Sequence, residues 1–375
     1  MSKMTEAQKK EYFKYLATHR ERIEKDRAFV DATIDEHLKF VPHKKLYKFR
    51  TCNNDNFKIL EENCIWMPPA ETFLDTFDST INIEFEKNKK KLFASIKDDF
   101  IRVFYDFINN LFLQNGLEFT IQYSEFEKVF HECINDYGEL DREKEKAFLM
   151  SVANEEELAN FEILFSKICE QRSRLESRIP EISERVISTV EEISTRQRRE
   201  ALTYCMTSDY TNTALWENYA NKYTGFCIEY SFENYKAAPF DIYKNLLYLM
   251  PITYKKRAPG FDIVKFVSRA AKESADHDTS WRYSPELISD INMQFYYKKS
   301  NYDYEKEWRF SIKNRNNSKQ PFPFVSAIYA GKDIKPRDLQ RLKKIAKKLR
   351  VPLYRQEQRR FNREYSYIPV EEVTK

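Results

Sequence analysis

The segment YEKEWRF, residues 304–310, places two carboxylates, Glu305 and Glu307, two positions apart and beside Arg309. Side chains at positions i and i+2 of a β-strand share one face, so a strand here would point both carboxylates the same way. Like charges held together raise the free energy of the folded chain unless a substrate uses them or a cation pairs with them. The structural alternative is pairing with Arg309 or Lys299 at a sheet edge.

Glycine, cysteine and histidine exclude several other kinds of chemistry. A phosphate-binding loop or a dinucleotide fingerprint needs several glycines within a few residues. The chain has five glycines, each more than twenty residues from the next, so both motifs are excluded. The six cysteines form no C-x-x-C pair and the five histidines no H-x-x-x-H pair, which disfavours a structural zinc site.

The composition is typical of a soluble protein with a sizeable core, with 42% hydrophobic and 33% charged residues in a chain of 375. No basic start leads into an apolar stretch, and no apolar run reaches the ~20 residues of a membrane helix. We therefore expect a cytoplasmic protein that has no membrane partner.

Positive charge is concentrated near the C-terminus. Residues 332–363 hold 13 basic and 3 acidic side chains. Within them, RDLQRLKKIAKKLR places apolar residues at helical spacing with lysines on the other side. This pattern predicts a basic amphipathic helix, either with a merely solvated face or with a phosphate-rich partner such as a nucleic acid.

The order of patterns predicts an α+β protein, in which a split mixed sheet domain is interrupted by a large all-helical insertion. We expect a helical segment at 1–40, the first part of the α+β domain at 41–83, the insertion at 84–200 and the second part at 201–375. Apolar stripes in the insertion predict packing surfaces, within the chain or in a homodimer. Ser124 with Glu127 predicts a capping box, and Ser284 before Pro285 predicts a helix start.

Four stretches together resemble a family of mostly bacterial proteins known as domain of unknown function twenty-nine seventy-one. They are LYKFR at 46–50, FLDTFD at 73–78, LWENYANKYTGFCIEY at 215–230 and KKSNYDYEKEWRF at 298–310. The resemblance covers roughly residues 45–82 and 200–355. It implies a role in bacterial defence or abortive infection, with no settled activity.

An arginine on an early strand followed by a late E-x-E is also similar to the order in ADP-ribosyltransferases, which cleave NAD. That similarity implies that Arg50 holds the diphosphate and that Glu307 is the catalytic carboxylate. Glu305 would then orient or deprotonate the acceptor. An arginine suits diphosphate, and a carboxylate stabilises the positive charge that develops as the glycosidic bond breaks.

Tyr219 and Trp216 are the candidates for stacking on nicotinamide, and Arg309 is included among the NAD-binding residues. Structural alternatives remain open for each of them. Arg50 could pair with an acid of FLDTFD, and Trp216 and Tyr219, three positions apart on a helix, could belong to the core.

The sequence thus predicts an ADP-ribosyltransferase-like toxin or phage-defence effector that consumes NAD and modifies a macromolecule, restrained by a neutralising partner. One alternative is a nuclease in which carboxylates converge on Mg²⁺, namely Asp75, Asp78, Glu305 and Glu307. Another is a non-enzymatic sensor of a nucleotide or phage component.

Overall fold

The computed structural model describes residues 4–73, 75, 78–114, 121–134, 141–152, 166–170, 185, 187–266, 284–313, 318–358 and 365–370. The chain forms two compact units. Unit 1 consists of Met1–Ile81, Ser194–Pro259 and Arg282–Lys375, and unit 2 of Asn82–Ile193 and Gly260–Trp281. Unit 1 therefore includes the N-terminal helices. Unit 2 includes the predicted insertion and also Gly260–Trp281, which was predicted to belong to the second part of the α+β domain.

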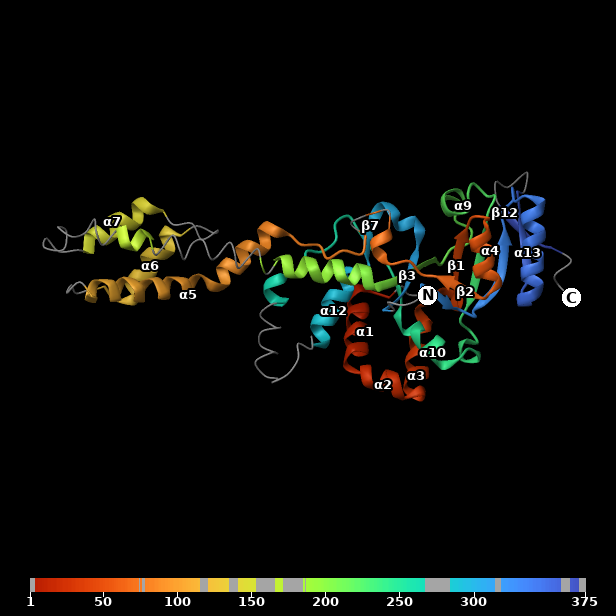
Figure 1. Ribbon diagram of the computed structural model, residues 1–375, viewed down its shortest axis with the longest axis horizontal. Coiled ribbons are helices and arrows are strands. Elements are labelled where there is room, and N and C mark those ends of the chain that lie inside the picture. Colours follow the sequence, from red (N-terminus) through yellow and green to blue (C-terminus); the bar gives the residue numbers. More distant parts are fainter. Residues whose placement is uncertain are drawn as a thin grey trace. The chain divides into compact units, whose positions relative to one another are not determined.

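Unit 1 is built on an eight-stranded sheet with the order β12-β11-β10-β4-β1-β3-β8-β5 (Figure 1). Its strands are β1 (Lys45–Arg50), β3 (Ala201–Thr207), β4 (Phe226–Ser231), β5 (Leu249–Pro251), β8 (Glu307–Lys313), β10 (Val325–Ala330), β11 (Leu353–Gln358) and β12 (Tyr365–Pro369). All neighbours pair antiparallel except β10 and β11, which are parallel. The prediction of an α+β fold with a mixed sheet is confirmed.

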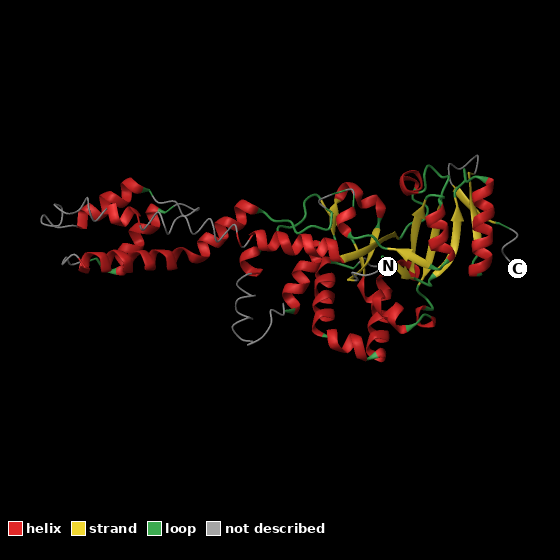
Figure 2. Cartoon of the chain, viewed as in Figure 1, coloured by secondary structure: helices red, strands yellow, loops and turns green. Residues whose placement is uncertain are grey.

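Two small sheets and several helices complete the described part of unit 1 (Figure 2). The small sheets pair β2 (Cys64–Trp66) with β9 (Lys319–Pro321), and β6 (Thr253–Lys255) with β7 (Tyr297–Lys299). The α-helices are α1 (Glu6–Thr18), α2 (Arg20–Lys25), α3 (Arg27–His37), α4 (Asn54–Glu61), α9 (Thr213–Tyr219), α10 (Phe240–Tyr243), α12 (Pro285–Gln294) and α13 (Pro336–Leu349). The 3-10 helices are η1 (Leu38–Phe40), η2 (Pro42–Lys44), η3 (Ala70–Thr72), η4 (Tyr235–Ala237), η5 (Lys244–Tyr248) and η6 (Ser300–Glu305).

The two faces of the large sheet bury different clusters. On one side, Tyr47 and Phe49 pack with Trp216 of α9, and we call this side the α9 face. On the other side, Leu46 packs in the larger core that includes α3, α4 and α13, and we call this side the α13 face. Alternation along β1 then places Lys48 and Arg50 on the α13 face.

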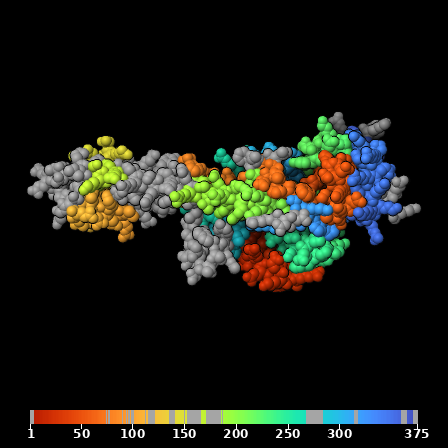
Figure 3. Space-filling model, viewed as in Figure 1, coloured from red at the N-terminus to blue at the C-terminus, as the bar shows by residue number. Residues whose placement is uncertain are grey.

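The predicted basic helix is α13, and it lies beside α4 on the surface (Figure 3). Its apolar side is buried through Leu342, Ile345 and Ala346. On its basic side, Arg341 stands over the ring of Phe57 and donates to the side chain of Asn54. Part of the basic surface is therefore used within the fold.

The described part of unit 2 is mainly helical, with α5 (Phe85–Gln114), α6 (Tyr123–Cys133) and α7 (Arg142–Val152). Phe104, Phe126 and Phe130 form its aromatic centre, with ring centroids 4.1–6.4 Å apart. The predicted capping box is wrong, because α6 begins one residue before Ser124 and its N-cap makes no side-chain bond. Throughout the described residues of the chain, no helix has the length and apolar character needed to cross a bilayer.

Candidate functional site

The two glutamates of YEKEWRF do not lie on one strand. Glu305 ends η6, Lys306 has left-handed backbone angles (φ 45°, ψ 45°), and β8 begins at Glu307. The expectation that strand alternation would bring the carboxylates together is therefore wrong. The left-handed backbone of Lys306 turns the chain between Glu305 and Glu307, and this turn brings their carboxylates together.

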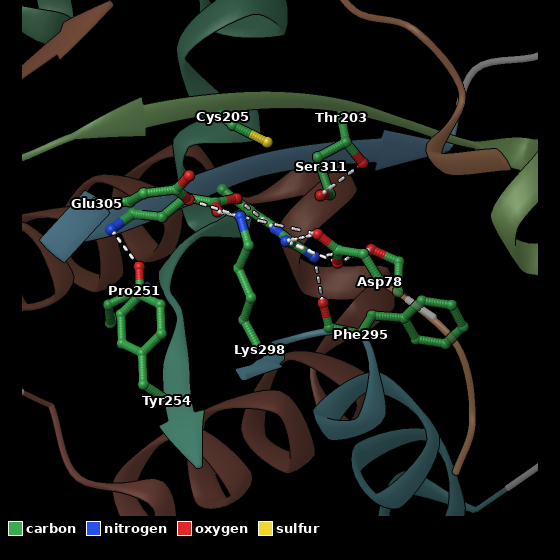
Figure 4. A network of polar contacts seen from close by, with 12 residues as sticks. Asp78, Thr203, Cys205, Pro251, Tyr254, Phe295, Lys298, Glu305 and Ser311 are labelled. Carbon is green, nitrogen blue, oxygen red and sulfur yellow. Dashed lines mark hydrogen bonds and ion pairs between the residues drawn. The ribbon is translucent and has the colours of Figure 1, made fainter. Parts of the chain in front are cut away.

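Both carboxylates meet at the ammonium group of Lys298 on β7 (Figure 4). Lys298 Nζ donates to Glu305 Oε2 at 2.6 Å and to Glu307 Oε2 at 2.9 Å, and Asp78 Oδ2 lies 4.0 Å away. Burial works against the charge of Lys298, but the two glutamates raise its pKa above the ordinary value. Lys298 thus supplies one counter-charge to the two glutamates from within the chain.

Arg309 supplies the second counter-charge and is 1% exposed. Its Nε donates to Glu307 Oε1 at 2.6 Å, and its Nη2 to Asp78 Oδ2 at 2.8 Å. Its Nη1 donates to Ser79 Oγ and to the carbonyl of Phe295. Burial would raise the pKa of Glu307, but Arg309 and then Lys298 hold that pKa well below its ordinary value, so Glu307 is a carboxylate at neutral pH.

Tyr219 connects this network to solvent. Its side chain is 49% exposed, and its hydroxyl donates to Glu305 Oε1 at 3.0 Å. Burial of the hydroxyl and the neighbouring Glu305 raise the pKa of Tyr219. Glu305 therefore has an exposed aromatic residue as a direct neighbour.

A single asparagine positions α9 against η6. Asn212 caps α9, because its Oδ1 accepts from the backbone N–H of Leu215. Its Nδ2 donates to the carbonyl of Tyr304, the residue before Glu305. The start of the helix that carries Tyr219 is thus fastened to the segment that carries its partner.

Trp216 is part of the core. It has no exposed surface, its indole N–H donates to the carbonyl of Tyr210, and its ring lies 5.0 Å from Phe49 and 6.0 Å from Tyr223, centroid to centroid. The structure therefore places Tyr219, and not Trp216, where a ring could be reached by a ligand.

Arg50 does not join the carboxylates. Tyr47 pairs with Thr207, and Thr207 pairs with Glu307, so Glu307 projects on the α9 face, whereas Arg50 projects on the α13 face. The guanidinium of Arg50 lies 5.4 Å from the ring centroid of Tyr204. Asp78, an acid of FLDTFD, pairs with Arg309 rather than with Arg50.

The ammonium of Lys298 lies where the nuclease alternative would place Mg²⁺. The ammonium of Lys298 lies among the carboxylates of Glu305, Glu307 and Asp78, where a cation would bind. Asp75 is half-buried. In the described segments of the chain, no group of three or more His, Cys, Asp or Glu residues is placed to hold a metal ion.

Lys298 is the residue of this network that sequence reasoning missed. The structural alternative named Arg309 or Lys299 as the partner; Arg309 does pair with Glu307, and alternation along β7 selects Lys298 in place of Lys299. The two consecutive lysines of KKSNYDYEKEWRF indicated that a cation could lie near the glutamates. The sequence did not indicate which of the two side chains would point toward them.

Residues 215–310 match the model of a family described as "Protein of unknown function (DUF2971)". No curated protein and no solved structure matches the chain. The matched segment runs from α9 into β8 and contains Tyr219, Lys298, Glu305 and Glu307, so it includes most of the network around Lys298.

Proposed function

We propose that this chain, whose residues 215–310 belong to the DUF2971 family, cleaves the nicotinamide–ribose bond of NAD and transfers ADP-ribose to a macromolecular acceptor. One observation carries the proposal. Two buried carboxylates, Glu305 and Glu307, converge on one ammonium beside the half-exposed ring of Tyr219.

The charge of this network suits the reaction. The formal charges of Asp78, Glu305, Glu307, Lys298 and Arg309 leave a net charge of −1. Cleavage of a glycosidic bond develops positive charge on the sugar, and a fixed carboxylate in a site of low dielectric constant stabilises that charge. Because the glutamates are already held by hydrogen bonds, little reorganisation is needed when the charge appears.

The two glutamates would have different roles. Glu305 touches Tyr219, so we assign it to the ribose hydroxyls or the acceptor. Glu307 is enclosed by Lys298 and Arg309, so we assign it to the fixed negative charge that the developing cation meets. The exposed ring of Tyr219 offers a face for nicotinamide.

The test is mass spectrometry of NAD and of macromolecules after the purified protein is incubated with NAD and cell lysate. Glu305→Gln and Glu307→Gln are compared with Glu233→Gln, a control at an exposed glutamate outside the network. We expect an adduct of one ADP-ribose with the wild type and the control. Both network variants should lower its yield by at least about 100-fold, the scale of losing one strong electrostatic stabiliser.

Circular dichroism of each variant shows whether the fold is intact. Intact NAD with no adduct from the wild type would overturn the proposal, and so would full activity of Glu307→Gln.

A further inference from the structure

A second pair of like charges lies on β1, where Lys48 and Arg50 are two positions apart and, unlike the glutamates, on one continuous strand. Both project on the α13 face and both are half-buried. The ammonium of Lys48 lies 5.1 Å and the guanidinium of Arg50 5.4 Å from the ring centroid of Tyr204. One aromatic ring therefore lies beside two cations.

No carboxylate of the described residues forms an ion pair with either cation. Lys48 Nζ donates to the backbone carbonyl of Cys205 at 2.6 Å. Glu305 and Glu307 act on Lys48 only at longer range, beyond ion-pair distance. Burial and then the neighbouring Arg50 lower the pKa of Lys48 to about 8. Lys48 is therefore still mostly protonated at neutral pH, and the described part of the chain supplies no ion-pair partner to either cation.

Hydroxyl groups are available beside the cations. The hydroxyls of Tyr204 and Tyr230 are buried and 2.9 Å apart. Burial raises the pKa of Tyr204, and the neighbouring Arg50 acts in the opposite direction. Burial keeps both phenols protonated at neutral pH. One of them donates to the other, which leaves one O–H that can donate to an anionic oxygen.

We infer that Lys48 and Arg50 bind a doubly charged phosphate group on the α13 face, opposite the carboxylates around Lys298. Two positive charges match a phosphate dianion better than a singly charged carboxylate. A guanidinium offers a planar fork of donors to phosphate oxygens, and lysine adds a point charge. The inference is separate from NAD cleavage, because neither cation is among the residues that form ion pairs with Glu305 and Glu307.

The test is isothermal titration calorimetry of the full chain with inorganic pyrophosphate and with inorganic phosphate. Arg50→Gln removes the fork, Arg50→Lys keeps a charge without it, and Lys48→Gln removes the second cation. Lys344→Gln, an exposed lysine of the basic helix α13, is the matched control for non-specific attraction.

We expect Arg50→Gln and Lys48→Gln each to weaken pyrophosphate binding by about tenfold or more, the effect of one charge-assisted hydrogen bond. Arg50→Lys should lose less, and Lys344→Gln should bind within about twofold of wild type. Equal weakening by Lys344→Gln, or wild-type binding by Arg50→Gln, would overturn the inference.

Thermal unfolding separates a binding role from a structural one. Without phosphate, Arg50→Gln should unfold at the wild-type temperature or above it, because it relieves the repulsion from Lys48. With pyrophosphate, only the wild type and the control should be stabilised. A lower unfolding temperature for Arg50→Gln in the absence of phosphate would assign Arg50 to the fold instead.

Discussion

Two pairs of like charges, each two residues apart, have opposite environments in unit 1. The carboxylates of Glu305 and Glu307 receive two cations from the same chain, Lys298 and Arg309. The cations of Lys48 and Arg50 receive an aromatic ring and a backbone carbonyl, and no carboxylate of the described residues. A motif that attracts attention in the sequence can thus be paired within the chain, while a less conspicuous one has no ion-pair partner among the described residues.

The difference arises from what packs on each side of the sheet. On the α9 face, β7 brings Lys298 to the glutamates, and Arg309 follows Glu307 on the same side of β8. On the α13 face, the neighbours of Lys48 and Arg50 include the phenol rings of Tyr204 and Tyr230. Phenols offer hydroxyls and ring faces but no charge.

The largest effect should come from Arg309→Gln, which leaves Glu307 and Asp78 buried without their shared cation. Breaking a buried ion pair costs about 3–5 kcal/mol in free energy of unfolding, because an uncompensated charge remains. Urea denaturation measures it, with Arg50→Gln as the matched variant of the other pair. Similar small losses for both variants would remove the distinction between the two pairs.

The second prediction concerns pH and the uncompensated pair. The pKa of Lys48 is about 8 in the folded chain, below the ordinary 10.5, so the unfolded chain binds more protons between these values. Stability should therefore rise across this window, in which Lys48 loses its unfavourable charge. Relative to Lys48→Met, the wild type should gain up to about 3 kcal/mol between pH 8 and 10.5.

Urea denaturation at several pH values measures that difference, with Lys344→Met as a control for an exposed lysine. A flat difference, or one that falls as the pH rises, would show that the charge of Lys48 is compensated after all.

The smallest effect should come from Tyr219→Phe, which removes one hydroxyl from Glu305 and leaves the ion pairs intact. A single hydrogen bond contributes about 1 kcal/mol to stability, somewhat more when the acceptor is charged. Chemical denaturation of the variant should show a loss of this size. A loss as large as that of Arg309→Gln would mean that Tyr219, and not the cations, holds Glu305 in place.

Local signals in the sequence predicted parts of the fold well. Ser284 caps α12 through the backbone N–H of Leu287, and Pro285 is its first residue, as predicted. Such caps depend on residues that are neighbours in the chain, so the sequence contains all of the information. The family resemblance was also visible in the sequence, and the family model confirms it for residues 215–310.

The site was harder to predict because it depends on non-local geometry. The residue types near Glu305 and Glu307 were apparent, but the left-handed backbone of Lys306 was not, since lysine seldom adopts it. Whether Lys298 or Lys299 points toward the glutamates depends on which face β7 turns toward them, and the sequence did not define that orientation. Arg50 was predicted to hold the diphosphate of the NAD that Glu307 cleaves, and strand alternation places its side chain on the other face of the sheet from Glu307.

The bond between Asp78 and Arg309 has a consequence for the order of biosynthesis. These residues are 231 positions apart, and all the residues of unit 2 are made between them. A growing chain therefore exposes Asp78 long before its arginine exists, and this contact closes a loop of 231 positions. A chain truncated before β8 lacks Glu307 and Arg309 together, so incomplete translation products cannot assemble the network around Lys298.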